Sequence, residues 1–362
     1  MKIVFYISQL GGGGAERVTS VIASGLAQRG HDVYLVVKRR YESDYDFDKN
    51  IKIVLVEPKK LKSKLAYIMY YTDLREKIIE INPDVIVGVM HLNFYRIWIA
   101  TQGLGIPIVA SDHSNFHRNA SENIKKIRYV MYDQAAITTV LTENDKEFMK
   151  HILHNMVVMY NPLSFPILDH KTEREKTVIC AGRVTSWHIK GFDRMIEIWS
   201  KVCHEHPDWR LLIAGNGKDT DFLNLKEMIK EKGVEESVSL LGFRTDIKDL
   251  MSQSSIFALP SREEGFPCVL TEAMSQGCAP MSFEIHGNIR EIITDGEDGL
   301  IVPDGDLDTF AEKLNELMNN EEFRNSIGEK AMKSMERFTS DKIVDRWEEM
   351  LTDLIDKKKN SK

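Results

Sequence analysis

Lys2-Ile-Val-Phe-Tyr-Ile-Ser-Gln-Leu-Gly-Gly-Gly-Gly-Ala-Glu-Arg17 joins a short apolar run, a glycine-rich turn and the start of a helical pattern. The apolar run, residues 3–7, does not alternate with polar residues, which is typical of a parallel strand covered on both faces. The helical pattern continues to residue 29 and is followed by Gly30, a residue that commonly ends helices. This stretch therefore predicts the first strand and helix of a parallel α/β sheet.

The same alternation of apolar runs and helical patterns continues over most of the chain. It pauses at residues 161–176, which are polar and contain prolines, as expected of a linker. The runs that we expect to form strands are residues 3–7, 33–37, 51–56, 85–89, 106–110, 136–141 and 157–160 before the pause, and 177–181, 211–214, 238–241, 256–259, 279–283 and 300–302 after it. Charged amphipathic helices are expected at 321–337 and 341–356. The sequence thus predicts an α/β protein with two Rossmann-like domains, 1–165 and 170–338, that face each other across a ligand-binding cleft.

The composition is that of a globular protein, with 43% hydrophobic and 28% charged residues. No apolar run reaches the roughly 20 residues that a membrane-spanning helix needs. The formal net charge of −7 argues against nucleic acid as a partner. The cysteines, Cys180, Cys203, Cys268 and Cys278, lack metal-ligand spacing and are interpreted as reduced thiols. Since the first residues also lack a signal-peptide pattern, we expect a cytoplasmic protein.

The glycine turn, residues 11–14, is the first candidate binding site. Glycines at the start of a helix let backbone N–H groups approach an anion. A dinucleotide fingerprint would need a small residue where Glu16 stands and an acidic residue where Lys38 and Arg39 follow the second strand. An NAD site is therefore disfavoured. NADP, for which a basic pair is suited, and a tight turn without a ligand remain alternatives.

Arg183 and Lys190 form the second candidate site. Arg183 follows a predicted strand, and Lys190 precedes a predicted helix, in Ala181-Gly-Arg-Val-Thr-Ser-Trp-His-Ile-Lys-Gly191. Two cations at the carboxyl edge of a parallel sheet suit a diphosphate. The alternative is two unrelated surface cations.

A pair of carboxylates is the third candidate, in Ser261-Arg-Glu-Glu-Gly-Phe-Pro-Cys-Val-Leu-Thr-Glu272. If a helix begins near Phe266, the carboxylates of Glu264 and Glu272 lie roughly 10 Å apart. Glycoside hydrolases need their two carboxylates about 5–9.5 Å apart. The spacing instead suits a ligand with hydroxyl groups at both ends, such as a nucleotide sugar.

A turn in Ile285-His-Gly-Asn-Ile-Arg-Glu291 is the fourth candidate. Gly287 and Asn288 tolerate a positive φ, and the amides that follow could hold phosphate or sugar hydroxyls at a helix start. A plain turn before a helix is the alternative.

His113, in Ser111-Asp-His-Ser-Asn115, is the fifth candidate because it follows a predicted strand and would face the expected cleft. A structural histidine is the alternative.

Three Asp-x-Asp sequences, at residues 44–48, 219–221 and 304–306, match a pattern that binds divalent cations in one class of glycosyltransferases. Each lies in a polar stretch of an acidic chain, so we interpret all three as solvated loops. We therefore expect neither a metal nor another cofactor.

Residues 59–71 place four lysines before aromatic and aliphatic residues. Such a segment can rest on an anionic membrane surface. An ordinary amphipathic helix with a solvated end is the alternative.

Taken in their order along the chain, the five candidate sites resemble those of the retaining glycosyltransferases of family 4, which have the GT-B fold. Residues 264–274 resemble the family signature EGFP-x-V-L-x-E-A-M, and Arg183 and Lys190 match the cations upstream of it. The resemblance covers nearly the whole chain. It implies that a final helix, at about 341–358, returns to complete the first domain, and that the cleft closes by a hinge near Asn161-Pro162.

The resemblance also implies residue roles. Arg183 and Lys190 would bind the donor diphosphate and stabilise it as it leaves, Glu264 would contact hexose hydroxyls near the anomeric carbon, and Glu272 would bind the ribose. His113 would lie near the donor sugar, so the expected catalytic residues are Glu264, Arg183, Lys190 and His113. Further donor contacts are implied at Gly13, Gly14, Gly265, Phe266, Gly287, Asn288 and Ile289. Asn288 stands where the family has a second glycine, which puts that contact in question.

The implied activity is metal-independent transfer of a hexose or N-acetylhexosamine, with retention of configuration, from a nucleotide sugar. UDP-linked galactose or N-acetylgalactosamine is favoured as donor, and the acceptor would be a growing glycan or lipid-linked saccharide of a lipopolysaccharide or capsule. Acceptor recognition is expected around residues 91–96 and 116–119, and the protein would work peripherally at the inner face of the plasma membrane. The alternatives are a GT-B nucleotide-sugar epimerase, a non-catalytic nucleotide-sugar binder and a metal-dependent transferase.

Overall fold

The structure is a computed structural model that describes residues 1–11, 13–39, 45–58, 64–117, 120–170 and 172–360. The chain divides into two compact units. Unit 1 contains Met1–Ser164 and Ser340–Lys362, and unit 2 contains Phe165–Thr339. The boundaries expected from the sequence, at 165, 170, 338 and 341, lie within a few residues of these.

Unit 1 contains a seven-stranded parallel sheet in the order β3-β2-β1-β4-β5-β6-β7. Its strands are β1 (Lys2–Ile7), β2 (Asp32–Val37), β3 (Lys52–Leu55), β4 (Val85–Val89), β5 (Ile108–Ser111), β6 (Ile137–Val140) and β7 (Met156–Val158). Every residue of β4 is buried, which explains its unbroken run of Val, Ile and Gly. The parallel α/β fold predicted from the sequence is therefore confirmed for this unit.

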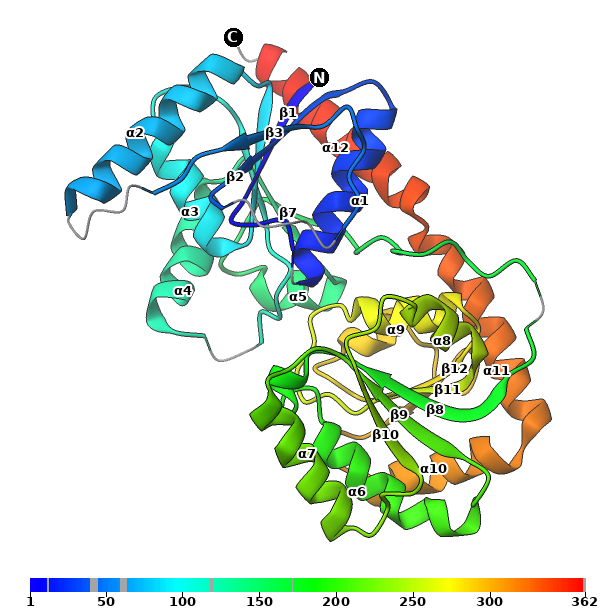
Figure 1. Cartoon of the computed structure of the whole chain (residues 1–362). Coiled ribbons are helices and arrows are strands. Elements are labelled where there is room, and N and C mark those ends of the chain that lie inside the picture. The colour runs from blue at the N-terminus through cyan, green and yellow to red at the C-terminus, as the bar shows by residue number, and fades with distance from the viewer. Residues whose placement is uncertain (12, 40–44, 59–63, 118–119, 171, 361–362) are drawn as a thin grey trace. The chain divides into compact units, whose positions relative to one another are not determined.

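Helices flank the sheet of unit 1 (Figure 1). They are α1 (Gly14–Gln28), α2 (Lys64–Ile81), α3 (His91–Ala100), α4 (Glu122–Lys126), α5 (Glu143–Met149) and α12 (Ser340–Asn360). The C-terminal helix α12 packs along α1, and Trp347 on α12 lies against Phe5 of β1 with ring centroids 6.4 Å apart. The end of the chain therefore supplies part of the core of unit 1.

Unit 2 repeats this architecture with a six-stranded parallel sheet in the order β10-β9-β8-β11-β12-β13. Its strands are β8 (Glu175–Ala181), β9 (Arg210–Ala214), β10 (Val238–Gly242), β11 (Ser254–Leu259), β12 (Ala279–Phe283) and β13 (Leu300–Val302). Its helices are α6 (Phe192–Val202), α7 (Asp219–Glu231), α8 (Ile247–Gln253), α9 (Cys268–Ser275), α10 (Leu307–Asn319) and α11 (Glu321–Ser334). Because all strands run the same way, the loops after β8, β11 and β12 lie on one edge of the sheet.

Two expected helix positions need correction. Helix α9 begins at Cys268 rather than near Phe266, since Pro267 restricts the residue before it to extended conformations. Glu272 is therefore little more than one turn into the helix. Residues 219–221 are the first turn of α7 rather than a loop, and Asp221 accepts a hydrogen bond there from the Lys218 N–H (3.0 Å). Residues 304–306 form the loop expected from the sequence, and Asp306 accepts a hydrogen bond from the Thr309 N–H (3.0 Å) at the start of α10.

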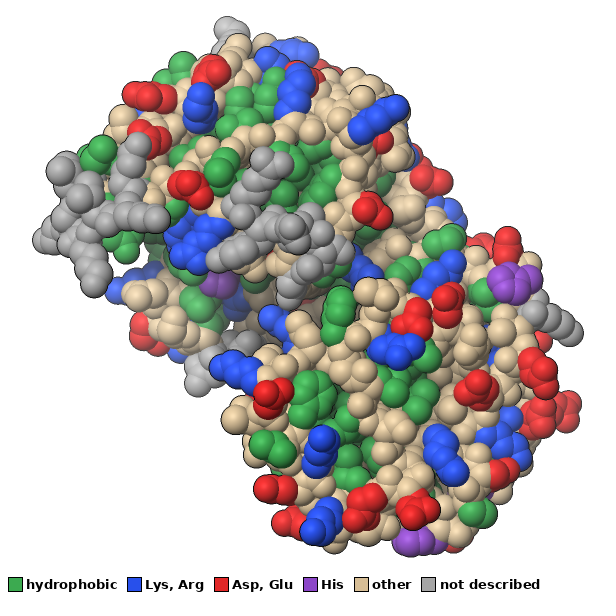
Figure 2. Space-filling model, in the orientation of Figure 1, with side chains coloured by type: hydrophobic (Ala, Val, Ile, Leu, Met, Phe, Trp, Pro, Cys, Tyr) green, Lys and Arg blue, Asp and Glu red, His purple; other side chains and the backbone are tan. Residues whose placement is uncertain are grey.

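The basic and aromatic segment at residues 59–71 is described in part. Residues 59–63 lie outside the described residues, and the remainder forms the first turns of α2, where Tyr67 and Ile68 are exposed and Tyr70 is buried. Among the described residues, no helix is both long enough and apolar enough to cross a membrane. Acidic and basic side chains are interspersed over the surface that Figure 2 shows.

The close approach of α1 and α12 predicts the effect of one substitution. A Cβ atom on Gly25 would lie 2.6 Å and 3.0 Å from the two methyl groups of Val344. We expect Gly25→Ala to destabilise the protein by about 1–2 kcal/mol, because overpacking costs more than the helix propensity of alanine gains. The measurement is the urea unfolding midpoint.

Gly25→Ala/Val344→Ala should recover most of that loss, because the smaller side chain makes room for the new methyl group. Gly14→Ala is the control, since its Cβ would meet no atom within 4 Å. An unchanged midpoint for Gly25→Ala would show that α12 does not pack on α1 in this way.

Candidate active site

Two loops meet at the carboxyl edge of the sheet of unit 2. One follows β8 and the other follows β11, and these strands are neighbours at the position where the strand order changes direction. In open parallel sheets, ligands bind in the crevice outside such a position. The loops touch at Gly191, which has a φ of 69° and where any Cβ would collide with the carbonyl oxygen of Pro260. Only glycine allows this contact.

Lys190 and Glu264 are brought into direct contact by these loops. The Lys190 Nζ atom lies 2.8 Å from the Glu264 Oε1 atom, and the Ser261 hydroxyl donates to the same oxygen over 2.7 Å. The carboxylate is 9% exposed. No described residue donates to its other oxygen, Oε2, so that oxygen remains able to accept from a sugar hydroxyl.

Arg183 is next in the chain to the backbone that Lys190 covers. The stem of Lys190 runs over Gly182, where a Cβ would lie 3.2 Å from the Lys190 Cγ atom. The Arg183 side chain is exposed and has no carboxylate partner among the described residues. A guanidinium and an ammonium placed together can bind a diphosphate through charge-assisted hydrogen bonds.

A second ion pair, which was not predicted from the sequence, joins the same loops. The guanidinium of Arg262 donates to both carboxylate oxygens of Asp193, over 2.8 Å and 2.7 Å, and its backbone N–H donates to the Ile189 carbonyl oxygen over 2.8 Å. Burial raises the pKa of Asp193, but the Arg262 hydrogen bonds and charge outweigh burial and hold it below its usual value. The pair positions Lys190 from one side of the loop.

The side chain of Asn288 holds the backbone of the loop that carries Glu264. Its side chain is fully buried, and its Nδ2 atom donates to the carbonyl oxygens of Gly265 (2.9 Å) and Glu264 (3.4 Å). Its backbone N–H donates to the Ile285 carbonyl oxygen over 3.1 Å, after Gly287 in the left-handed region with a φ of 81°. The residue that departs from the family pattern therefore holds the backbone of Glu264, a role that the sequence analysis did not find.

The remaining candidates in unit 2 lie around this loop. Glu272 is buried on α9, and Ile289 is fully buried in the short helix Asn288–Glu291. The Phe266 ring packs edge-on against Phe338 with centroids 5.2 Å apart and is therefore part of the core. A donor could reach Phe266 and Gly265 through their backbone only. The carboxylate separation expected for Glu264 and Glu272 stays a prediction, as do the donor contacts.

Gly13, Gly14 and His113 belong to unit 1. Gly13 precedes α1, Gly14 is its first residue, and the Tyr45 hydroxyl donates to the Gly13 carbonyl oxygen over 3.0 Å. Of the residues expected to recognise the acceptor, Phe116 is buried, and residues 118 and 119 lie outside the described part of the chain. Contacts of these residues with a donor stay predictions.

The imidazole of His113 is held at both nitrogens. Its Nδ1 atom lies 3.1 Å from the Asn161 Oδ1 atom, and its Nε2 atom lies 3.0 Å from the Ser111 hydroxyl, which accepts from Thr139. Because a carboxamide oxygen only accepts, we assign the proton to Nδ1. Burial lowers the pKa of His113, although Asn161 and Asp112 oppose the shift. The ring is therefore neutral near pH 7 and suited to hydrogen bonding rather than to acid catalysis.

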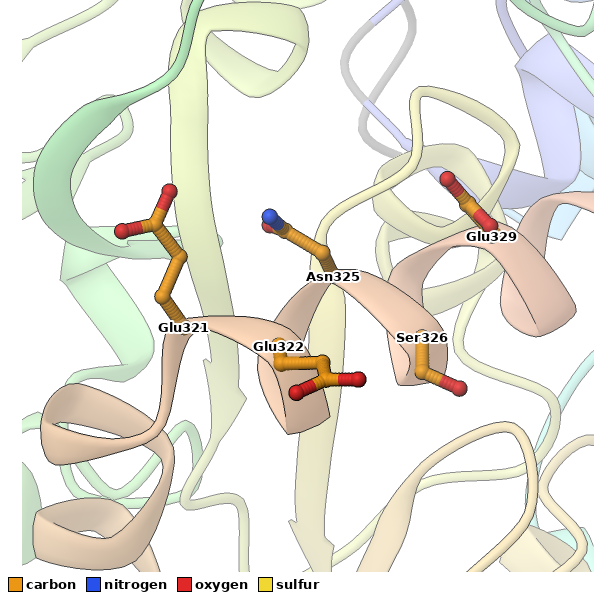
Figure 3. A pocket seen from close by; sticks show the side chains of 5 residues that line it. All are labelled: Glu321, Glu322, Asn325, Ser326 and Glu329. Carbon is orange, nitrogen blue, oxygen red and sulfur yellow. The ribbon is translucent and has the colours of Figure 1, made fainter.

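Hollows elsewhere on the chain do not coincide with this site. One of about 540 Å³ lies over α11 and is lined by Glu321, Glu322, Asn325, Ser326 and Glu329. Figure 3 shows these polar side chains spread along the helix, and none of the candidate site residues lines the hollow. Its carboxylates would repel a diphosphate. Within the described part of the chain, no three His, Cys, Asp or Glu side chains gather in a way that could hold a metal ion.

Two parallel α/β units, with cations and a buried carboxylate at the carboxyl edge of one sheet, are the arrangement expected of a glycosyltransferase with the GT-B fold. Residues 12–164 match the family model described as Glycosyltransferase Family 4, and residues 169–334 match the one described as Glycosyl transferases group 1. The chain belongs to the glycosyltransferases of the family 4 type.

Known proteins of similar length agree with this assignment. An uncharacterized glycosyltransferase of Haemophilus influenzae is 26% identical over 97% of this chain and 99% of that protein. A GalNAc-alpha-(1->4)-GalNAc-alpha-(1->3)-diNAcBac-PP-undecaprenol alpha-1,4-N-acetyl-D-galactosaminyltransferase of Campylobacter jejuni is 27% identical over 98% and 99%. Anabaena HepE, solved in complex with UDP and glucose, shares the fold with a TM-score of 0.83, 19% identity and coverage of 98% and 100%.

The brace from Asn288 predicts a kinetic effect. Asn288→Ala removes both hydrogen bonds to the backbone of residues 264 and 265 and frees the carboxylate to move. We expect kcat/KM for transfer to fall about tenfold or more, since small displacements of positioned groups cost large factors in rate. Steady-state kinetics with a saturating acceptor measure it.

Asn320→Ala is the matched control, because Asn320 caps α11 outside the site by accepting from the Phe323 N–H. It should cost about 1 kcal/mol of stability and leave kcat/KM unchanged. If Asn288→Ala and Asn320→Ala have the same kcat/KM, Asn288 does not position Glu264 for catalysis and only stabilises the fold.

Proposed function

We propose that the chain is a retaining glycosyltransferase that moves a hexose or N-acetylhexosamine from a UDP-sugar to a growing glycan or lipid-linked saccharide. The observation that carries the proposal is the contact of Lys190 with Glu264 beside Arg183 at the carboxyl edge of the sheet of unit 2. Galactose and N-acetylgalactosamine are the favoured donors. The named activity of the Campylobacter relative is transfer of N-acetylgalactosamine in an alpha-1,4 linkage to a saccharide on an undecaprenol carrier. It supports N-acetylgalactosamine as the donor sugar and a lipid-linked saccharide as the acceptor.

The proposed chemistry follows from the charges that develop. As the bond between the anomeric carbon and the diphosphate breaks, positive charge builds on the sugar and negative charge on the leaving group. Arg183 and Lys190 stabilise the diphosphate, and Glu264 lies where it can bind sugar hydroxyls. The acceptor oxygen bonds to the anomeric carbon on the face that the diphosphate leaves, and its proton passes to a phosphate oxygen. Configuration is retained, and neither a covalent nucleophile nor a metal is needed.

Two other functions have distinct signatures. A nucleotide-sugar epimerase would convert the donor without an acceptor. A non-catalytic binder would bind the donor without turnover. Acceptor-dependent release of UDP separates the proposed transferase from both.

Substitution of the three charged residues tests the proposal. We expect Arg183→Ala, Lys190→Ala and Glu264→Ala each to lower kcat/KM by about 10²-fold or more, because each would remove an interaction that strengthens in the transition state. Acceptor-dependent UDP release from a panel of UDP-sugars measures the rate. NMR of the product identifies its anomeric configuration.

Lys176→Ala is the control, since Lys176 is exposed at the amino end of β8, opposite the carboxyl edge that carries the site, and pairs with Asp208. It should retain the full rate. Near-normal rates for the three site variants would reject their roles, an inverted product would reject retention, and loss of activity in EDTA would reject metal independence.

We further propose that unit 1 binds an anionic membrane surface through the start of α2, which would place the enzyme peripherally at the inner face of the plasma membrane. Tyr67 is 71% exposed and Ile68 is 62% exposed on adjacent positions of this helix. The lysine-rich residues 59–63 precede them in the sequence. Apolar side chains flanked by cations favour binding to acidic lipids.

Vesicle binding tests this surface. Tyr67→Ser/Ile68→Ser should weaken binding to phosphatidylglycerol-containing vesicles about tenfold, because two apolar side chains no longer enter the lipid. Co-sedimentation at low salt measures the binding. Phe243→Ser, which changes an equally exposed aromatic residue of unit 2, should have no effect. If the double variant binds like the unmodified protein, α2 is not the docking helix.

A further inference from the structure

A cluster of positive charge lies in unit 1 at the topological position that the candidate site has in unit 2. The order of the strands changes direction between β1 and β4, and the carboxyl ends of the strands meet there. Ser8 follows β1, Lys38 follows β2, and α3 begins directly after β4. This crevice is where a parallel sheet of this kind usually binds its ligand.

Arg96 reaches this edge from the second turn of α3. Its guanidinium donates to the Ser8 hydroxyl over 3.3 Å and to the Asn93 carboxamide oxygen over 3.2 Å, and the Ser8 hydroxyl donates to the same oxygen over 2.6 Å. The Nδ2 atom of Asn93 is in turn held by the Val89 carbonyl oxygen at 2.7 Å. These partners are neutral. The position of the guanidinium is therefore fixed while its charge is uncompensated.

Lys38 lies close to Arg96 and is half-buried. Its ammonium is 5.9 Å from the centroid of the Tyr70 ring, and no described carboxylate pairs with it or with Arg96. Burial lowers the pKa of Lys38, and the charges of Arg96 and then Arg39 lower it further. Like charges held together in a half-buried position are costly, and a bound anion relieves that cost.

Helix α2 carries tyrosines and exposed apolar side chains near these cations. Tyr70 forms a hydrogen bond to Tyr6 beneath Lys38, and its ring meets that of Tyr71 edge-on with centroids 5.8 Å apart. One turn earlier on α2, Tyr67 and Ile68 are exposed. Aromatic side chains present an apolar face and a polar hydroxyl, which suits a sugar or the start of an apolar chain. Tyr70 itself is buried, and the exposed side chains of Tyr67 and Ile68 lie on the same helix within one turn of it.

Building on the proposed function, we propose that Lys38 and Arg96 bind a phosphate group of the acceptor, and that the acceptor is a saccharide joined through phosphate or diphosphate to an apolar carrier. The phosphate lies between the two cations, where charge-assisted hydrogen bonds replace the missing carboxylate. The carrier extends over Tyr67 and Ile68. The donor diphosphate is assigned to the cations of unit 2, so each unit has its own anion site.

Binding of a diphosphate probe tests the site without turnover. The full-length Arg183→Ala/Lys190→Ala protein lacks the donor cations and is titrated with octyl diphosphate and with inorganic pyrophosphate by calorimetry. We expect octyl diphosphate to bind more tightly than pyrophosphate. Adding Lys38→Gln or Arg96→Gln should weaken its binding about tenfold or more, since each removes a charged hydrogen-bond donor.

Further variants separate a binding role from a structural one. Arg96→Lys should retain most of the affinity, and Lys77→Gln, which changes a lysine of α2 paired with Glu80, should retain all of it. The site would be overturned if octyl diphosphate does not bind at all. It would also be overturned if adding Lys38→Gln or Arg96→Gln leaves the affinity of the Arg183→Ala/Lys190→Ala protein unchanged, with folding checked by thermal melting. Octyl diphosphate that binds no better than pyrophosphate would overturn the apolar carrier.

A kinetic comparison keeps this inference separate from the proposed function. Transfer to a saccharide on octyl diphosphate is compared with transfer to the same saccharide as a neutral octyl glycoside. Lys38→Gln and Arg96→Gln should raise KM for the first acceptor about tenfold and leave KM for the second and for the donor unchanged. Equal rises for both acceptors would overturn the phosphate site. An enzyme that transfers to neither refutes the proposed function, while the titration still decides the site.

Discussion

The ion pair of Lys190 and Glu264 is the interaction on which the site of unit 2 depends. It joins two loops that lie 74 positions apart in the sequence and meet only because β8 and β11 are neighbours in the sheet. Removing one partner of a largely buried ion pair leaves the other charge without compensation, which costs more than the pair contributes. Gly191 permits the close contact of the loops, and the Ser261 hydroxyl donates a second hydrogen bond to the same carboxylate oxygen.

Both units use the same position in the same topology. In unit 2 the strand order changes direction at β8 and β11, and in unit 1 it changes at β1 and β4. Each position carries cations without a described carboxylate of their own: Arg183 in one unit, Lys38 and Arg96 in the other. A transferase must hold two substrates, and a repeated α/β unit offers one crevice for each. The distribution of unpaired cations is therefore consistent with a phosphate-containing group in both crevices.

Much of this architecture could be predicted from the sequence. Unbroken runs such as residues 85–89 coincide with strands because both faces of a parallel strand are buried. Helix boundaries were predicted less accurately. Helix α9 begins two residues later than expected because Pro267 keeps the residue before it out of the helical conformation. The sequence also could not reveal the Arg262–Asp193 pair or the brace from Asn288, since contacts between residues far apart in the chain leave no periodic pattern. The resemblance to a family placed the charged residues together but assigned Asn288 only a backbone contact.

The Lys190–Glu264 pair already has the polarity that the proposed reaction requires. Negative charge develops on the diphosphate, to which the ammonium can still offer two of its three N–H groups, and positive charge develops on the sugar, towards which Glu264 can turn its second oxygen. The protein therefore need not reorganise its charges as the bond breaks, and this is where preorganised sites lower a barrier most. The two residues act as one unit, so the energetic effect of removing either cannot be divided between them. Arg262, Asp193 and Asn288 then matter to catalysis through geometry alone, by holding that unit in place.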